Sequence, residues 1–220
     1  MPGSPRSGGA EDPDEALRAV EALRAADPVL REVIDSVDGL GDPRAGRPHD
    51  QYGALVRSIV GQQLSTRAAQ AIYARLIERF GGRPPTQAEV LDDDPEALRM
   101  AAGLSRAKVA YLRSLAERVL DGSLRLDELE QLPDDEVIAE LTAVRGIGEW
   151  SAHMFLMFQL ERPDVLAVGD LGIRRAVMVR YGLDKLPTPA QLEAIAESWR
   201  PHRTLACRYL WRSLAATPAV

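Results

Sequence analysis

The chain has 220 residues, 45% of them hydrophobic and 27% charged, a composition ordinary for globular proteins. Its net charge of −6 argues against a protein that coats nucleic acid through overall positive charge. The single cysteine excludes an internal disulfide and a four-cysteine metal or iron–sulfur site, and no apolar run is long enough to span a bilayer.

The first twelve residues are rich in Gly, Ser and Pro and lack the apolar core of a signal peptide. We therefore expect residues 1–12 to be a disordered tail and the protein to be cytoplasmic. Asp12 and Asp27 each precede a proline, which is the pattern of an N-cap followed by Pro at the first helical position. They predict one helix to about Ala26 and a second that begins at Pro28.

Helix signals continue along the rest of the chain. Apolar residues at helical spacing predict a helix over Tyr52–Val60, and Ser65 caps the next one, which Gly81 and Gly82 end. The predicted inner face of that helix consists of Ala68, Ala69, Ile72, Leu76 and Phe80. Further helices are predicted to open at Thr86, Asp94, Ser105, Pro133, Thr188 and Pro201. Because no alternating strand pattern or Asn-Gly hairpin signal is present, we predict an all-α protein of ten or more short helices.

The most informative segment is Gly146-Ile147-Gly148, which lies between two apolar helical patterns. Glycine permits a sharp turn with positive φ and lets a phosphate approach backbone amides at a helix N-terminus. By itself this pattern also fits a plain turn between two helices. Asp170 follows 22 residues after Gly148, at the predicted start of another helix.

Positive charge is concentrated after the glycine turn. Residues 170–212 hold 8 basic and 4 acidic residues, whereas residues 1–50 and 51–169 each have a net charge of −5. This distribution fits a local phosphate-binding face, and it also fits an ordinary solvated helix face.

Other segments join this pattern and are specific when taken together. They are Ile59–Ser65 (IVGQQLS), Gly103–Lys108 (GLSRAK), Val144–Ala152 (VRGIGEWSA), Asp170, and Trp199–Arg203 (WRPHR). The combination resembles the helix-hairpin-helix (HhH-GPD) DNA glycosylase superfamily from Tyr52 to Trp211. Within it, the chain is most similar to the DNA-3-methyladenine glycosylase II type, in a short form without the extra N-terminal domain.

The resemblance implies an all-α fold of two helical lobes with the active-site cleft between them. Residues 13–216 would form the glycosylase domain, with a core lobe over 51–165 and a second lobe from the N-terminal helices plus 170–216. It also implies a monofunctional DNA N-glycosylase of base excision repair, which flips out alkylated bases, excises them and leaves an abasic site. The expected partner is double-stranded DNA with damaged bases, which implies association with the bacterial nucleoid and no membrane. The chain is expected to be a monomer.

Asp170 is the candidate catalytic residue. Breaking an N-glycosidic bond builds positive charge on the sugar, and a carboxylate beside C1′ can stabilise that charge and orient the attacking water. An Asp at a helix start can equally be a simple N-cap, and the two roles are compatible.

Trp150 and Trp211 are the candidate walls of the base pocket. Family members that also cut the strand carry a lysine at the position of Trp150, which forms a Schiff base with the sugar. No lysine lies near either motif in the sequence, so we predict a glycosylase without lyase activity. Two electron-rich rings favour a positively charged alkylated base, although either tryptophan could be a core residue.

The resemblance also assigns residues that hold the DNA. Leu64 matches the wedge that fills the gap left by the flipped base, with Gln63 beside it, although Leu64 could equally be a core leucine between two helices. Gln62 and Gln63 cannot be separated as contacts to the orphaned base or to the backbone. Gly146, Gly148, Arg174 and Arg203 are predicted to bind phosphate, and Arg175 and Lys108 are further candidates. We expect no cofactor except a structural Na⁺ or K⁺ held by the main-chain carbonyls of Thr142, Val144 and Ile147.

Three positions depart from the family pattern. Arg145 stands where many relatives have proline, and Met154 and Leu171 stand where some longer relatives have aromatic residues. A wider pocket would follow, accepting 1-methyladenine and 3-methylcytosine besides 3-methyladenine and 7-methylguanine. The alternatives are a non-catalytic DNA-binding module and a glycosylase for oxidised or mismatched bases, the latter weakened by the missing lysine and cysteine cluster.

Overall fold

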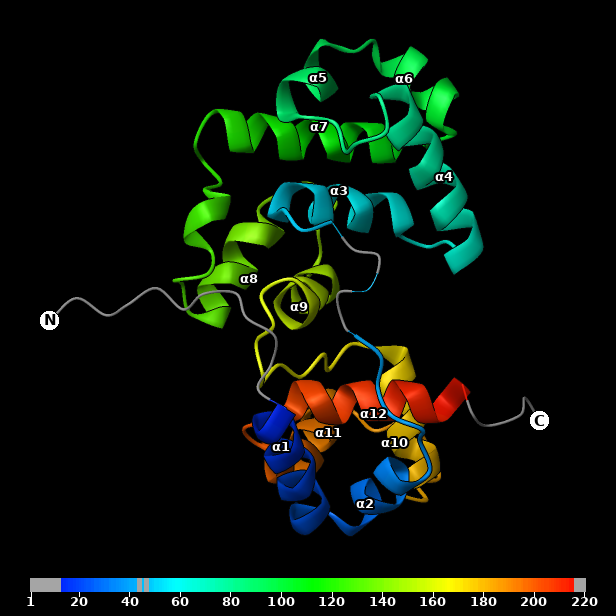
Figure 1. Ribbon diagram of the computed structural model, residues 1–220, viewed down its shortest axis with the longest axis vertical. Helices are drawn as coiled ribbons and strands as arrows, with labels where there is room; N and C mark the ends of the chain where they lie inside the picture. Colours follow the sequence, from blue (N-terminus) through cyan, green and yellow to red (C-terminus); the bar gives the residue numbers. More distant parts are fainter. Residues whose placement is uncertain (1–12, 43–44, 46–47, 216–220) are drawn as a thin grey trace, which may run out of the picture. The chain divides into compact units, whose positions relative to one another are not determined.

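The computed structural model describes residues 13–42, 45 and 48–215 (Figure 1). Every regular element in these ranges is a helix, which confirms the predicted all-α class. The chain divides into two compact units, Met1–Gly41 with Pro163–Val220, and Asp42–Arg162. The predicted tail and its neighbouring N-cap, Asp12, lie outside the described residues. Within the described ranges, no helix has both the length and the hydropathy needed to cross a membrane.

The first unit joins helices from the two ends of the chain. Its elements are α1 (Pro13–Ala26), α2 (Pro28–Asp35), α10 (Leu171–Arg180), α11 (Pro189–Ala196), the short η2 (Glu197–Trp199) and α12 (Arg203–Ala215). Helix α12 packs against α1, α2 and α10, so the last helix of the chain forms the centre of this unit (Figure 1).

A buried carboxylate fastens the first unit together. Asp27 caps α2 as predicted, accepting hydrogen bonds from the backbone N–H groups of Val29 and Leu30. Its other oxygen accepts from the Tyr181 hydroxyl at 2.6 Å and from Trp199 Nε1 at 2.9 Å. Since the residue is only 6% exposed, these four donors replace the water that a charged carboxylate loses on burial.

The second unit is built around α7. Its elements are α3 (Gln51–Gly61), α4 (Thr66–Arg79), α5 (Gln87–Asp92), α6 (Pro95–Ala102), α7 (Arg106–Leu120), the short η1 (Leu126–Glu128), α8 (Asp134–Thr142) and α9 (Glu149–Phe158). Helix α7 packs against α3, α5 and α6, while α3 also packs against α4 and α9 (Figure 1). The predicted caps at Ser65, Thr86, Asp94 and Ser105 all accept backbone hydrogen bonds from the helices they open.

Two local predictions need correction. The last helix begins at Arg203 rather than at Pro201, because a turn closed by the His202 N–H and the Trp199 carbonyl at 2.7 Å takes up the proline. On the predicted inner face of α4, only Leu76 is fully buried. The other four side chains on that face are half-exposed, since α4 packs mainly against α3 and α6 and one stripe of it is covered.

Candidate functional site

The glycine turn connects α8 to α9 in the second unit. Gly146 has φ of +89°, and a Cβ built there would lie 2.2 Å from Cγ of the Tyr111 ring. Only glycine therefore fits, both for its backbone conformation and for the close approach of the ring. Ile147 is 5% exposed and anchors the turn in the core of this unit. The sequence had predicted the turn but not the support from Tyr111.

Gly148 is the N-cap of α9, with φ of −99° and open space around the position of a Cβ. The first N–H groups of a helix have no partner within that helix, and in the described part of the chain no side chain caps this one. A helix start of this kind attracts anions because the helix dipole adds to the amide donors. That Gly146 and Gly148 bind a phosphate here stays a prediction.

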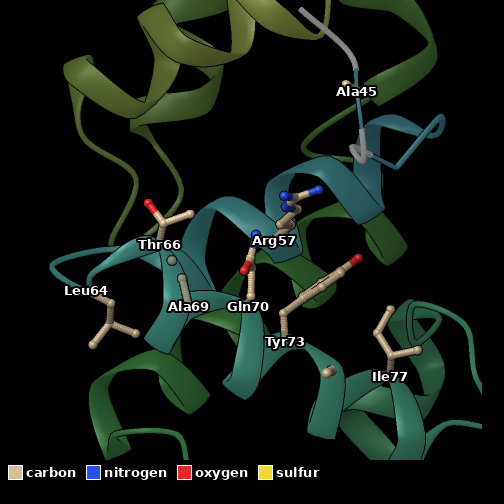
Figure 2. A pocket seen from close by; sticks show the side chains of 10 residues that line it. Ala45, Arg57, Leu64, Thr66, Ala69, Gln70, Tyr73 and Ile77 are labelled. Atoms are coloured by element: carbon tan, nitrogen blue, oxygen red, sulfur yellow. The ribbon is translucent and has the colours of Figure 1, made fainter. Parts of the chain in front are cut away.

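Trp150 lies in the first turn of α9 and is 47% exposed, which sets it apart from a core tryptophan. Together with Met154 and with Arg57 and Ser58 of α3, it lines a pocket of about 350 Å³. The sequence reasoning did not single out Arg57 or Ser58. Arg57 also lies 5.8 Å from the centroid of the Tyr73 ring, in an adjoining groove shown in Figure 2.

Residues 62–65 connect α3 to α4, and Gln62, Gln63 and Leu64 precede the N-cap Ser65. Leu64 is 37% exposed, and Gln63 is exposed with φ of +56°, a conformation uncommon for residues other than glycine. Gln62 differs from both, because it is half-buried and its Nε2 donates to the Gly146 carbonyl at 2.8 Å. In the second unit, the structure thus brings Gln62, Gln63, Gly146 and Trp150 to the lining of one pocket.

The expectation that no lysine lies near the motifs was wrong in three dimensions. Lys108 lines the same pocket as Gly146 and Trp150, although it lies 38 residues before the turn in the sequence. Its Nζ donates to the Val60 carbonyl at 2.8 Å, and burial lowers the pKa of its ammonium group. The sequence did not show that Lys108 is near the turn, because the two meet only when α7 packs against the turn.

Asp170 lies in the first unit, where it is the N-cap of α10 and only 8% exposed. Its Oδ1 accepts from the Ile173 N–H at 2.7 Å and from Trp211 Nε1 at 2.8 Å. Asp170 therefore caps α10, and the indole of Trp211 also fixes the position of its carboxylate. Trp211 thus hydrogen-bonds directly to the candidate catalytic group, while its predicted role as a wall of the base pocket stays a prediction.

Gly172 is a further residue that the sequence reasoning missed. A Cβ at this position would lie 3.0 Å from Asp170 Oδ1 and 3.1 Å from Trp211 Cδ1. Glycine is unfavourable inside a helix, so its presence in the first turn of α10 was a readable signal that something packs closely there. What packs there is the Asp170–Trp211 pair.

The two arginines predicted to bind phosphate are already engaged in the first unit. Arg203 donates through Nε and Nη2 to the Asp164 carboxylate at 2.7 and 3.0 Å, and its Nη2 also reaches the Asp164 carbonyl. Arg200 donates to the same carboxylate at 2.6 Å, so this part of the WRPHR segment fixes the approach to α12. Arg174 donates through Nε to the Pro187 carbonyl at 2.9 Å.

Comparison with known proteins agrees with this arrangement. Residues 56–201 match the model of the HhH-GPD superfamily base excision DNA repair proteins. The chain is 34% identical over 193 residues to DNA-3-methyladenine glycosylase 1 of Schizosaccharomyces pombe, covering 87% of this chain and 84% of that protein.

Solved structures give the same result. The S. pombe 3-methyladenine DNA glycosylase Mag1 in complex with abasic DNA has a TM-score of 0.80 at 34% identity, over 89% of this chain and 95% of that one. A DNA-3-methyladenine glycosidase of Bacillus halodurans has a TM-score of 0.77 at 38% identity, over 92% of this chain and 89% of that one. The predicted family is confirmed: the chain belongs to the HhH-GPD superfamily of base excision DNA repair proteins.

Proposed function

We propose that this protein is a monofunctional DNA N-glycosylase that excises alkylated bases from double-stranded DNA and leaves an abasic site. The observation that carries the proposal is the Asp170 carboxylate, buried at a helix N-terminus and held through Oδ1 by Trp211 at 2.8 Å. Similarity to glycosylases named for 3-methyladenine supports the substrate class.

In the proposed reaction, the bond between the base nitrogen and C1′ breaks and its electron pair leaves with the base. Positive charge then develops on C1′ and the ring oxygen, and the Asp170 carboxylate stabilises it electrostatically. A water oxygen adds to C1′ and passes a proton to the Asp170 carboxylate, which releases it to solvent, so one water is consumed and no covalent bond to the protein forms. Removal of such a general-base or electrostatic group costs about 10²–10⁴ in rate.

We propose that Trp150 recognises the flipped base through its exposed ring. A cationic purine stacked on tryptophan gains about 0.5–2 kcal/mol, which favours 3-methyladenine and 7-methylguanine over undamaged bases. Met154, in the same pocket, occupies a half-exposed position where some relatives have an aromatic side chain. We propose that the space this leaves admits 1-methyladenine and 3-methylcytosine.

We propose that the backbone amides of Gly146 and Gly148 bind a DNA phosphate and that Leu64 or Gln63 fills the gap left by the base. A monovalent cation would fit the turn, because α8 ends at Thr142 and leaves its last carbonyls without partners further along the helix. The Val144 carbonyl already accepts from the Ile147 N–H at 3.0 Å, but a carbonyl oxygen has a second lone pair. Such an ion would offset phosphate charge through main-chain oxygens alone.

The test is base release from methylated duplex DNA by the wild type and by Asp170→Asn. Asparagine is also a good N-cap, so the variant keeps the cap of α10 while losing the charge. We expect the wild type to release 3-methyladenine and the variant to be at least about 100-fold slower. No release by a folded wild type that still binds abasic duplex would contradict the enzyme and leave a DNA-binding module.

Two further arms test the finer parts of the proposal. Strand cleavage without alkali, or a protein–DNA adduct trapped by borohydride, would contradict the monofunctional reaction, and Lys108→Met would then identify the amine. For substrate range, Met154→Trp should remove activity on 1-methyladenine and 3-methylcytosine while retaining activity on 3-methyladenine. Equal loss on all lesions would contradict a pocket-size effect.

A further inference from the structure

A hydrogen bond from the Gln62 side chain connects the loop between α3 and α4 to the glycine turn. Gln62 Nε2 donates to the Gly146 carbonyl at 2.8 Å, across 84 residues of sequence. The next N–H along the chain, that of Ile147, donates to the Val144 carbonyl at 3.0 Å. The carbonyl and N–H belong to one planar peptide group, so this group is held on both of its sides.

Helix α7 contacts both the end of α3, where the loop begins, and the glycine turn. Lys108 Nζ donates to the Val60 carbonyl at the end of α3, also at 2.8 Å. Three residues later, the Tyr111 ring packs against Gly146, where it occupies the space that a Cβ would need. Residues three apart share one face of a helix, so one face of α7 contacts both the base of the loop and the turn.

Within the loop, the three side chains are placed differently. Gln63 and Leu64 are exposed, and Gln63 adopts a positive φ that carries the chain around the tip. Gln62 is half-buried and directed to the turn. Of the two adjacent glutamines, it is therefore Gln62 whose side chain donates to the turn, a difference that the sequence could not show.

We propose that Gln62 is a positioning residue, which aligns the phosphate-binding turn with the loop that enters the DNA and does not enter the DNA itself. The inference rests on the proposed function, because it assigns the turn to phosphate and the loop tip to the gap in the duplex. Binding of a phosphate at the turn would then fix where the exposed tip, Gln63 and Leu64, meets the base stack.

The variants that test it retain the length of the side chain. Gln62→Met and Gln62→Glu are similar in size to glutamine but have no N–H donor, and Gln63→Ala on the same loop is the matched control. The first measurement is hydrogen exchange at the amides of residues 146–148 in the free protein. Loss of one hydrogen bond predicts exchange faster by about threefold to tenfold in both Gln62 variants and unchanged exchange in Gln63→Ala.

The second measurement is affinity for an abasic duplex and single-turnover base release with each of the four bases opposite the lesion. Both Gln62 variants should weaken binding by about threefold to tenfold and slow release equally for all four opposite bases. Gln63→Ala should change the order of the opposite bases, because its target is the orphaned base.

The proposal is overturned if Gln62→Met leaves hydrogen exchange at residues 146–148 unchanged, or if the order of the opposite bases changes in Gln62→Met and not in Gln63→Ala. Faster release by Gln62→Met than by wild type would also overturn it, since an apolar wedge would then serve as well as the amide. If the wild type releases no base, the proposed function fails, while exchange and abasic-duplex affinity still decide the role of Gln62.

Discussion

Trp211→Phe isolates one hydrogen bond to the proposed catalytic carboxylate. The substitution keeps an aromatic ring on α12 and removes the Nε1 donor that lies 2.8 Å from Asp170 Oδ1. Asp170 is 8% exposed, so water replaces the lost donor only in part. The Ile173 N–H still donates to the same oxygen and retains the helix cap.

The magnitude follows from the charge of the acceptor. A hydrogen bond to a charged group contributes about 1.5–3 kcal/mol, and each 1.36 kcal/mol of barrier is tenfold in rate. If the bond holds the carboxylate where charge develops, Trp211→Phe should slow single-turnover base release by about 10- to 150-fold. Combining it with Asp170→Asn should cost no more than Asp170→Asn alone, because both substitutions act on one carboxylate.

Trp199→Phe is the matched control. It removes a Trp–carboxylate bond of nearly equal length, 2.9 Å to Asp27, in the same unit. We expect it to lower the free energy of unfolding by about 1–3 kcal/mol and to leave the release rate of the folded protein unchanged. The reasoning is refuted if Trp211→Phe releases base within twofold of wild type, or if its effect adds fully to that of Asp170→Asn.

Further substitutions and one reagent test other parts of the structure. Gly146→Ala places a methyl group 2.2 Å from the Tyr111 ring at positive φ, and should lower the free energy of unfolding by at least about 2 kcal/mol in a denaturant titration. Gly148→Ala meets no atom within 4 Å, so its stability should stay within about 0.5 kcal/mol while its affinity for abasic duplex falls; equal loss of stability in both variants would contradict this. Gly172→Ala brings a methyl group 3.0 Å from the N-cap carboxylate of α10, and should slow base release at unchanged DNA affinity. Burial raises the pKa of the Cys207 thiol to about 12, so a disulfide reagent at pH 8 should react only after unfolding; reaction in the native protein would show that α12 opens.

The helices were predictable because their signals are local. Thr86 and Thr188 each form a capping box with the residue three positions on, and Asp94 caps a helix that begins with proline. Such caps act over one helical turn, so the sequence contains everything needed to recognise them. The predicted helix start at Pro201 was wrong because no local cap marks the turn from Trp199 to His202, which delays the helix to Arg203.

Contacts between distant segments could not be predicted in this way. Arg203 has the charge and position expected of a phosphate contact, yet it pairs with Asp164, which lies 39 residues earlier. Lys108 was predicted only as a candidate phosphate contact, because no lysine lies near the turn in the sequence, yet the packing of α7 places Lys108 and Gly146 in the lining of one pocket. The sequence shows which charged residues are present, but the partner of each charged side chain depends on which helices pack together.

Asp27 and Asp170 have similar local sequence signals, so the sequence alone does not show how their roles differ. Each caps a helix, and each accepts a hydrogen bond from a tryptophan indole far along the chain. Asp27 is followed by Pro28 and bonded through both oxygens, and it serves the core of its unit. Asp170 instead stands between Gly169, with no atom within 4 Å of a built Cβ, and Gly172, whose missing side chain leaves room for the carboxylate. The proposed role of Asp170 requires room for a substrate to approach the carboxylate, so the open space at Gly169 distinguishes the two acids better than the caps or the tryptophans do.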